Sequence, residues 1–266
     1  MAGGGTGGTT LYMSERLNCT NAEIVYIDFS KSSLSLSKRR AKYQNIYNII
    51  WINDWLEDVK CLGLCHFHFI ESSGVLHHLK SPIHGLNTIK DMLCYNGGGM
   101  ELMLYAKFGR TAIYQMQSLF RMMFNNDDHT SSKVRKTRMT IKKLPATNWF
   151  IRYVNSNLEI IKDHIYFGDS GYYDMFLNSR DVKFTIKELQ NFVAKSGTNF
   201  VKHSSIYQYL DIINTYDRIP EILNNRLILE DKKMSIHELI SGNVIKHEIT
   251  ISAILNNTEQ LQLDKP

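Results

Sequence analysis

The first hundred residues alternate between two patterns of hydrophobic and polar positions. Short apolar and β-branched runs are typical of buried strands, and apolar residues that recur every three or four positions are typical of amphipathic helices. Strands that alternate with helices favour a mostly parallel sheet with helices on both faces. We therefore expect an α/β fold. The predicted strands are Glu23–Asp28, Ile49–Ile52, Leu64–Glu71 and Met100–Tyr105, and the predicted helices are Thr9–Leu17, Ser30–Tyr43 and Ile83–Leu93.

The pattern changes after Gly109. Thr111–Phe124 has the spacing of an amphipathic helix, whereas residues 125–143 are polar and basic and predict a loop or linker. The rest predicts mostly helices, with one strand at residues 199–201 that returns to the sheet. The expected helices open at the capping-box patterns Thr185–Glu188 and Ser235–Glu238, span Ser204–Tyr216, and resume after Pro220, before a frayed tail over Asn256–Pro266. We expect a core over residues 1–110, a helix and basic linker over 111–148, and a mostly helical extension over 149–266.

Composition places the chain among ordinary globular proteins. It has 266 residues, of which 43% are hydrophobic and 21% charged, and this excludes a disordered or fibrous protein. A signal peptide and an apolar run of roughly 18 residues are both absent from the sequence, so we expect a cytoplasmic protein with reduced cysteines and no membrane segment. The net charge of +5 is too small to indicate nucleic-acid binding by itself.

A glycine loop near the start is the first candidate for chemistry. Gly3–Gly8 contains the spacing Gly-x-Gly-x-Gly at Gly3, Gly5 and Gly7, which lets a backbone turn tightly and approach a nucleotide-like ligand. Glycine runs are also common in unstructured termini. Asp28, however, follows Gly8 by 20 residues at the end of the next predicted strand, where a carboxylate can accept both hydroxyls of a ribose.

A second acid extends this pattern. Asp54 follows the next apolar run, where it would meet the edge of an adenine ring, and Phe29 and Trp55 each stand beside one of the two acids. Their rings would flank the adenine. The ordered set of glycine loop, first acid and second acid favours a ligand site over a set of solvated strand ends.

Four ordered motifs together resemble class I S-adenosylmethionine-dependent methyltransferases. The resemblance covers about residues 2–106. Its motifs are Ala2–Gly7 as the first, Tyr26–Ser30 as the second, Phe67–Leu79 as the fourth-strand motif, and Gly85–Leu93, Gly97–Gly99 and Met100–Tyr105 as the helix, glycine turn and fifth strand that follow. The resemblance implies a Rossmann-like methyltransferase sheet with flanking helices, S-adenosylmethionine as the cofactor, and methyl transfer to an unidentified acceptor. We expect this acceptor to be a small molecule or a protein in preference to a nucleic acid.

The resemblance also assigns roles to individual residues. Gly3, Gly5 and Gly7 would line the methionine portion of the cofactor, Asp28 would hold the ribose, and Asp54 would meet the adenine. Ser72, Ser73 and Gly74 would line the cofactor site near the acceptor. His77 and His78 are candidates for a general base, because imidazole titrates near neutral pH, although such a pair is also an ordinary part of a helix-entry turn.

One part of the family pattern has no counterpart in the sequence. The first motif of the family follows a strand of about five apolar residues, whereas here Met1 and Ala2 stand directly before the glycines. We therefore expect that central strand to be missing from the sheet. This departure keeps open a degenerate, non-catalytic methyltransferase fold that serves as an interaction module. A nicotinamide-dependent (NAD) oxidoreductase stays open as well, since it shares the glycine loop and Asp28.

Two further clusters indicate other chemistry less strongly. Cys61, Cys65, His66 and His68 are residue types that bind zinc, but their spacing fits no common structural site, so we expect buried thiols and no metal. A basic run follows the predicted helix Thr111–Phe124. It would contact phosphates in an RNA methyltransferase, but it has few aromatic residues nearby for stacking on bases, so a solvated surface is favoured. The run consists of Lys133, Arg135, Lys136, Arg138, Lys142 and Lys143.

Overall fold

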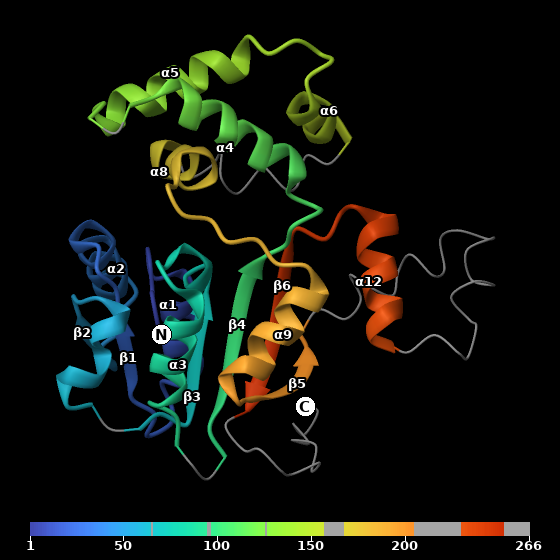
Figure 1. Ribbon diagram of the computed structural model, residues 1–266. Coiled ribbons are helices and arrows are strands. Elements are labelled where there is room, and N and C mark those ends of the chain that lie inside the picture. Colours follow the sequence, from blue (N-terminus) through green and yellow to red (C-terminus); the bar gives the residue numbers. More distant parts are fainter. Residues whose placement is uncertain (65, 95–96, 126, 157–167, 205–229, 253–266) are drawn as a thin grey trace. The chain divides into compact units, whose positions relative to one another are not determined.

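The computed structural model describes residues 1–64, 66–94, 97–125, 127–156, 168–204 and 230–252 (Figure 1). The chain forms two compact units, each made of segments that are distant in sequence. The first unit consists of Met1–Leu104, Ile186–Asp211 and His247–Pro266, and the second consists of Tyr105–Thr185 and Ile212–Lys246. Among the described residues, no helix is both long and apolar enough to cross a membrane.

Two sheets form the centre of the first unit. Strands β1 (Ile24–Ile27) and β2 (Ile49–Ile52) pair in parallel, with Ile24 opposite Ile49. The second sheet has the order β3-β4-β6-β5, in which β3 and β4 are parallel and β5 and β6 are antiparallel. Its strands are β3 (Phe69–Ser73), β4 (Gly99–Tyr105), β6 (Lys246–Ser252) and β5 (Asn199–His203).

Local sequence signals begin and end the helices of this unit. Ser30 caps α2 (Lys31–Tyr43) by accepting a 3.2 Å hydrogen bond from the amide of Ser33, as the sequence predicts. Ser81 caps α3 (Pro82–Lys90) in the same way. Gly197, with φ at +70°, follows the end of α9 (Ile186–Ser196). The remaining elements are α1 (Gly8–Arg16), the 3₁₀ turn η1 (Leu56–Leu62) and the 3₁₀ turn η2 (Leu76–His78).

The two sheets are separate at the place where the sequence pattern predicts a missing strand. Ala2 lies between them: its amide donates to the carbonyl of Glu71 in β3 at 2.8 Å, and the residue itself forms a parallel bridge with Ile27 in β1. A small cavity of about 30 Å³ adjoins this position. Apolar side chains of both edge strands and of the helices beneath line it, namely Met1, Ala2, Val25, Ile27, Leu56, Val59, Leu64, Phe67, Phe69, Ile70, Ile89 and Met92.

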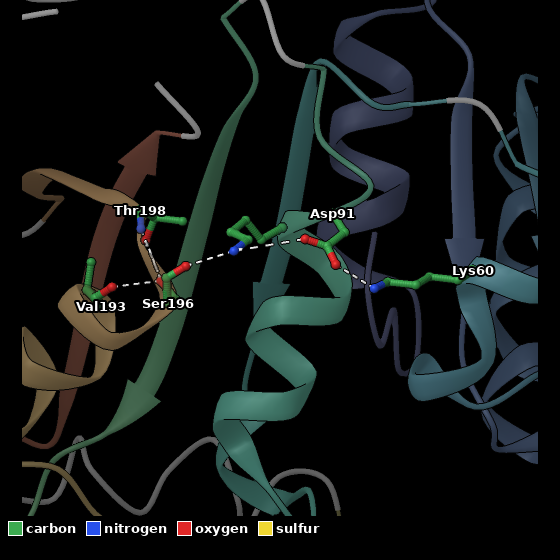
Figure 2. Close-up of polar contacts among 6 residues, drawn as sticks. Lys60, Asp91, Val193, Ser196 and Thr198 are labelled. Carbon is green, nitrogen blue, oxygen red and sulfur yellow. Dashed lines mark hydrogen bonds and ion pairs between the residues drawn. The ribbon is translucent and has the colours of Figure 1, made fainter. Parts of the chain in front are cut away.

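Polar contacts attach the returning segment α9 to the first part of this unit (Figure 2). Lys90, the last residue of α3, donates to the carbonyl of Ser196 at the end of α9, at 2.8 Å. The neighbouring Asp91 pairs with Lys60 of η1. The hydroxyls of Ser196 and Thr198 lie 2.7 Å apart and close the turn between α9 and β5. Helix α9 thereby joins the same unit as α3, although Lys90 and Ser196 are 106 positions apart in the chain.

The second unit is helical in its described part and packs around one apolar core. Phe120 of α4 and Phe150 of α6 both contact Phe176, whose ring lies 5.3 Å edge-on from that of Phe150. Ile113, Met116 and Met175 complete the buried centre. The elements are α4 (Thr111–Met123), α5 (Thr130–Lys142), α6 (Trp149–Ser156), α8 (Gly168–Tyr172), the π-helical turn η3 (Tyr173–Leu177) and α12 (Glu230–Ser241).

Three expectations are wrong at the level of elements. The loop expected over residues 125–143 is largely the helix α5, because Val134 and Thr137 are buried one turn apart. Ser235 does not open a helix, because it lies inside α12. Strand β6 was not expected at all. In the division into two units given above, α9, β5 and most of β6 belong to the first.

Several expectations concern residues outside the described ranges. These are the helix over Ser204–Tyr216, the helix after Pro220 and the tail over Asn256–Pro266.

Candidate functional site

The glycine loop is a tight turn that packs against two neighbouring elements. Gly3 has φ at +78°, and a Cβ atom there would lie 2.3 Å from a methyl group of Val75. A Cβ atom on Gly4 would lie 2.2 Å from the ring of Tyr26. Only glycine fits at either position. The loop therefore lies directly on the end of β1 and on the segment that follows β3.

Asp28 lies at the carboxyl end of β1 and binds this loop. One carboxylate oxygen accepts from the amide of Gly5 at 2.8 Å, and the other accepts from the amide of Ser30 at 2.8 Å. Each oxygen keeps a further lone pair for a ligand hydroxyl. The Asn53 side chain donates to the Asp28 carbonyl at 2.8 Å and links the ends of β1 and β2. The structure thus brings together the glycine loop and the first acid, as the spacing predicts.

Three side chains that the sequence analysis did not single out hold the loop in place. The hydroxyls of Tyr26 and Ser37 both donate to the carbonyl of Gly5, at 2.6 and 2.9 Å, and Arg40 donates to the carbonyl of Thr6 at 2.7 Å. Burial, reinforced by the charge of Asp28, raises the pKa of Tyr26 to about 12, so its hydroxyl stays protonated and can donate. Ser37 had a recognisable signal, since it lies four residues from Ala41 on the buried face of α2.

The second acid and the two aromatic residues lie at the ends of the same two strands. Asp54 is half-buried and accepts a 2.8 Å hydrogen bond from the amide of Trp55. The rings of Phe29 and Trp55 stack on each other, with centroids 4.7 Å apart and planes 9° apart, and both are exposed. Because the two rings touch, a planar ligand would lie on an outer face of the pair instead of between them.

The end of β3 reaches the other side of the glycine loop. Ser72 is buried and Ser73 is exposed, and Gly74, with φ at +74°, donates its amide to the carbonyl of Met103 in β4 at 3.1 Å. The next residue is Val75, the one that packs on Gly3. His77 is buried and His78 is half-buried in η2, with ring centroids 4.1 Å apart.

These residues fit a nucleotide-like ligand. A Cβ atom on Gly5 would meet nothing within 4 Å, so there is open space over the loop at the residue whose amide binds Asp28. Helix α1 begins directly after the loop, with Gly7 at its N-cap and no side chain that caps it. Its first backbone amides add partial positive charge there. Such a ligand needs an acceptor for its ribose hydroxyls and donors for a polar group. The Asp28 carboxylate offers the acceptor, and the first amides of α1 offer the donors.

The expectation of buried thiols in the segment from Cys61 to His68 is wrong at Cys61, which is exposed in η1. Cys65 lies outside the described residues.

Comparisons with known proteins match one part of the chain to a known domain. A family model described as "Methyltransferase domain" matches residues 2–98. An uncharacterised protein from Synechococcus sp. is 29% identical over 206 residues, which are 76% of this chain and 47% of that protein. The structure of PKMT2 from Rickettsia typhi in complex with AdoHcy has a TM-score of 0.69 and 16% identity, over 94% of this chain and 47% of PKMT2. A second structure of PKMT2 from the same organism has a TM-score of 0.65 and 14% identity, again over 94% of this chain and 47% of that one.

The matched region is the part of the chain that the sequence motifs indicate. The PKMT2 structures share its fold, a sheet flanked by helices with a mostly helical remainder. The chain spans about half the length of these relatives. Residues 2–98 contain the glycine loop, Asp28, Asp54 and the end of β3. The comparisons therefore match a methyltransferase domain to residues 2–98, the part of the chain that holds the candidate site.

Proposed function

We propose that this chain binds S-adenosylmethionine at the glycine loop and transfers its methyl group to an acceptor. The observation that carries the proposal is the Asp28 carboxylate, bound to the loop through Gly5 within a matched methyltransferase domain. When bound, the cofactor supplies a methyl group on a positively charged sulfur. Methyl transfer is a direct displacement, in which the acceptor attacks the methyl group and the sulfur leaves. It requires mainly that acceptor, methyl and sulfur be aligned, so the chain's contribution is to position them.

Different residues would contact different parts of the cofactor. Asp28 would accept the ribose hydroxyls, and Gly3, Gly5 and Gly7 would let the backbone approach the methionine portion closely. Asp54, with the stacked pair of Phe29 and Trp55, would contact the adenine. Ser72, Ser73 and Gly74 would form the opposite wall, towards the acceptor.

A general base is needed only for an acceptor that arrives protonated. His77 and His78 are the titratable residues that follow this wall most closely in the chain, and they are our candidates for that role. We propose an acceptor that is a small molecule or a protein.

Binding of S-adenosylhomocysteine, measured by calorimetry, tests the proposal. The Asp28→Asn variant keeps the size of the side chain but removes its charge, so we expect binding to weaken roughly tenfold or more, which is the usual effect of losing hydrogen bonds to a charged group. The matched control is Asp58→Asn, an exposed acid in η1 of the same unit.

Three results would contradict the proposal. If the folded wild-type chain bound NAD instead, the oxidoreductase alternative would replace it. If it bound neither ligand, a non-catalytic interaction module would be the better account. Equal weakening by Asp28→Asn and Asp58→Asn would remove Asp28 from the site.

A further inference from the structure

Helix α2 of the first unit carries a stripe of positive charge on its exposed face. The helix has five basic residues and no acid among its 13 residues. Four of them, Lys31, Lys38, Arg39 and Lys42, are spaced so that they lie on one face over about 16 Å of the helix axis, and all four are exposed. We call these four residues the α2 stripe. A shallow hollow of about 380 Å³ follows it, lined by the stripe together with Leu34 and Ser35.

The charges of the α2 stripe destabilise the helix slightly. Lys38 and Lys42 are four residues apart, where like charges repel, and Lys31 is the first residue of the helix, where a positive charge opposes the helix dipole. In the part of the chain that the structure describes, no residue of the stripe pairs with an acid. The stripe is therefore available to an anionic partner, and helix stability does not account for it.

Exposed aromatic rings lie at the carboxyl end of the α2 stripe. Tyr43 is the last residue of α2, one helical turn from Arg39, and is 89% exposed. Tyr47, four residues further along the chain, is 77% exposed. Proteins that bind single-stranded nucleic acids combine such rings, on which unpaired bases stack, with a row of cations that binds the phosphates. An acidic peptide would use the cations but would give the rings no role.

Helix α5 of the second unit is equally basic but lacks this arrangement. It also has five basic residues and no acid among 13 residues, and none of the 13 is aromatic. Its charges are spread around the helix, since Lys133 and Arg135 are two positions apart and lie on nearly opposite sides. Arg138 moreover pairs with Asp169 at 2.9 Å. Helix α5 therefore serves as a control of the same charge.

We infer that the exposed face of α2 binds single-stranded nucleic acid. The α2 stripe contacts successive phosphates, and Tyr43 stacks on an unpaired base. A lipid surface fits this face less well, because Leu34 and Ala41 on the apolar side of α2 pack in the core of the first unit and are not offered to a membrane. The inference concerns a partner other than the methyl acceptor and does not depend on the proposed function.

Fluorescence anisotropy of a labelled oligouridine of about 12 nucleotides tests the inference on the full chain. We expect saturable binding at about 50 mM salt that weakens as salt is added. The double variant Lys38→Gln, Arg39→Gln should weaken binding roughly tenfold or more. It should also reduce the slope of log K against log salt by about 1.4, since each lost phosphate contact removes about 0.7. Tyr43→Ala should weaken binding roughly fivefold or more and leave that slope unchanged, because stacking releases no counterions.

The matched control is the double variant Arg135→Gln, Lys136→Gln, which removes two exposed cations of α5 and should leave the affinity for oligouridine unchanged. Equal weakening by the two double variants would show attraction to the overall charge of the chain and would overturn the inference. If Tyr43→Ala bound like the wild type, or if polyglutamate displaced oligouridine as well as unlabelled oligouridine does, an acidic protein would be the better account of the partner. Unchanged anisotropy at low salt would refute the site itself.

Discussion

At the scale of single residues, the glycines of the loop are not equivalent. A Cβ atom on Gly4 would collide with the ring of Tyr26 at 2.2 Å, whereas a Cβ atom on Gly8, the first residue of α1, would meet nothing within 4 Å. Tyr26 has little room to move, because it is fully buried and its hydroxyl is bound to Gly5. The same substitution should therefore have opposite effects at these two sites.

The Gly4→Ala variant should lose about 1–3 kcal/mol of unfolding free energy, because the ring of Tyr26 or the loop must shift. Gly8→Ala should be neutral or should gain up to about 1 kcal/mol, since alanine loses less conformational entropy than glycine in a helix. Urea unfolding of both variants measures the difference. Equal losses in the two variants would contradict the packing of the loop on β1.

The buried His203 makes the unfolding free energy depend on pH. Burial, with a contribution from the charge of His247, lowers the pKa of His203 in β5 from 6.5 to about 4. Below pH 6.5 the His203 side chain binds a proton in the unfolded chain but stays neutral in the folded chain. The unfolding free energy is therefore highest above pH 6.5 and falls as the pH is lowered towards 4. The loss would be of the order of 3 kcal/mol at most.

Unfolding free energies between pH 7 and 4 test this prediction. We expect His203→Gln to flatten the decline, and His129→Gln, at an exposed position before α5, to leave it unchanged. A decline of the same slope in His203→Gln would assign the pH dependence to other groups.

At the scale of elements, α5 shows why composition is a weaker guide than spacing. The segment 125–143 is so basic that it was expected to be a loop, yet Val134 and Thr137 are buried, and Ile141 one turn later packs on the core around Phe120 and Phe176. The basic side chains lie on the other faces, where Arg138 pairs with Asp169 at 2.9 Å. Val134, Thr137 and Ile141 thus recur at helical spacing on the face that packs against the core, and this pattern favours a helix.

Truncation of that buried face should destabilise the second unit. Val134→Ala should cost about 1–3 kcal/mol, because it leaves a cavity against the core, and the exposed Arg135→Ala should cost less than about 0.5 kcal/mol. Thermal unfolding followed by circular dichroism compares the two. A Val134→Ala variant as stable as Arg135→Ala would mean that α5 does not pack on this core.

The strands were predicted best where the sequence has a short, nearly continuous run of apolar residues. Strand β2 coincides with the predicted Ile49–Ile52, and β1 and β4 agree to within a residue or two. Strand β6 was missed, although His247, Ile249 and Ile251 are buried in strict alternation. Its first residues are lysine, histidine and glutamate, which are not typical of a buried strand, so the alternation of buried and partly exposed positions was overlooked.

At the scale of the whole molecule, local patterns cannot predict which distant segments assemble. The sequence motifs correctly grouped the glycine loop with Asp28, because a fixed spacing links consecutive strand ends in a parallel sheet. They gave no sign that α9 and β6 join the first unit, since that depends on contacts such as Lys90 with Ser196, 106 positions apart. The support of the loop by Tyr26 was missed for the same reason, whereas the spacing of Ser37 and Ala41 does indicate that Ser37 is buried.

Hydrogen–deuterium exchange with and without S-adenosylhomocysteine reports both whether this ligand binds and where it binds. We expect slower exchange at the amides of Gly3–Gly8, at Asp28–Ser30 and at Ser72–Val75, and unchanged exchange in α5. Protection confined to other segments would contradict the proposed site, and an absence of protection in folded protein at saturating ligand would contradict the proposed function.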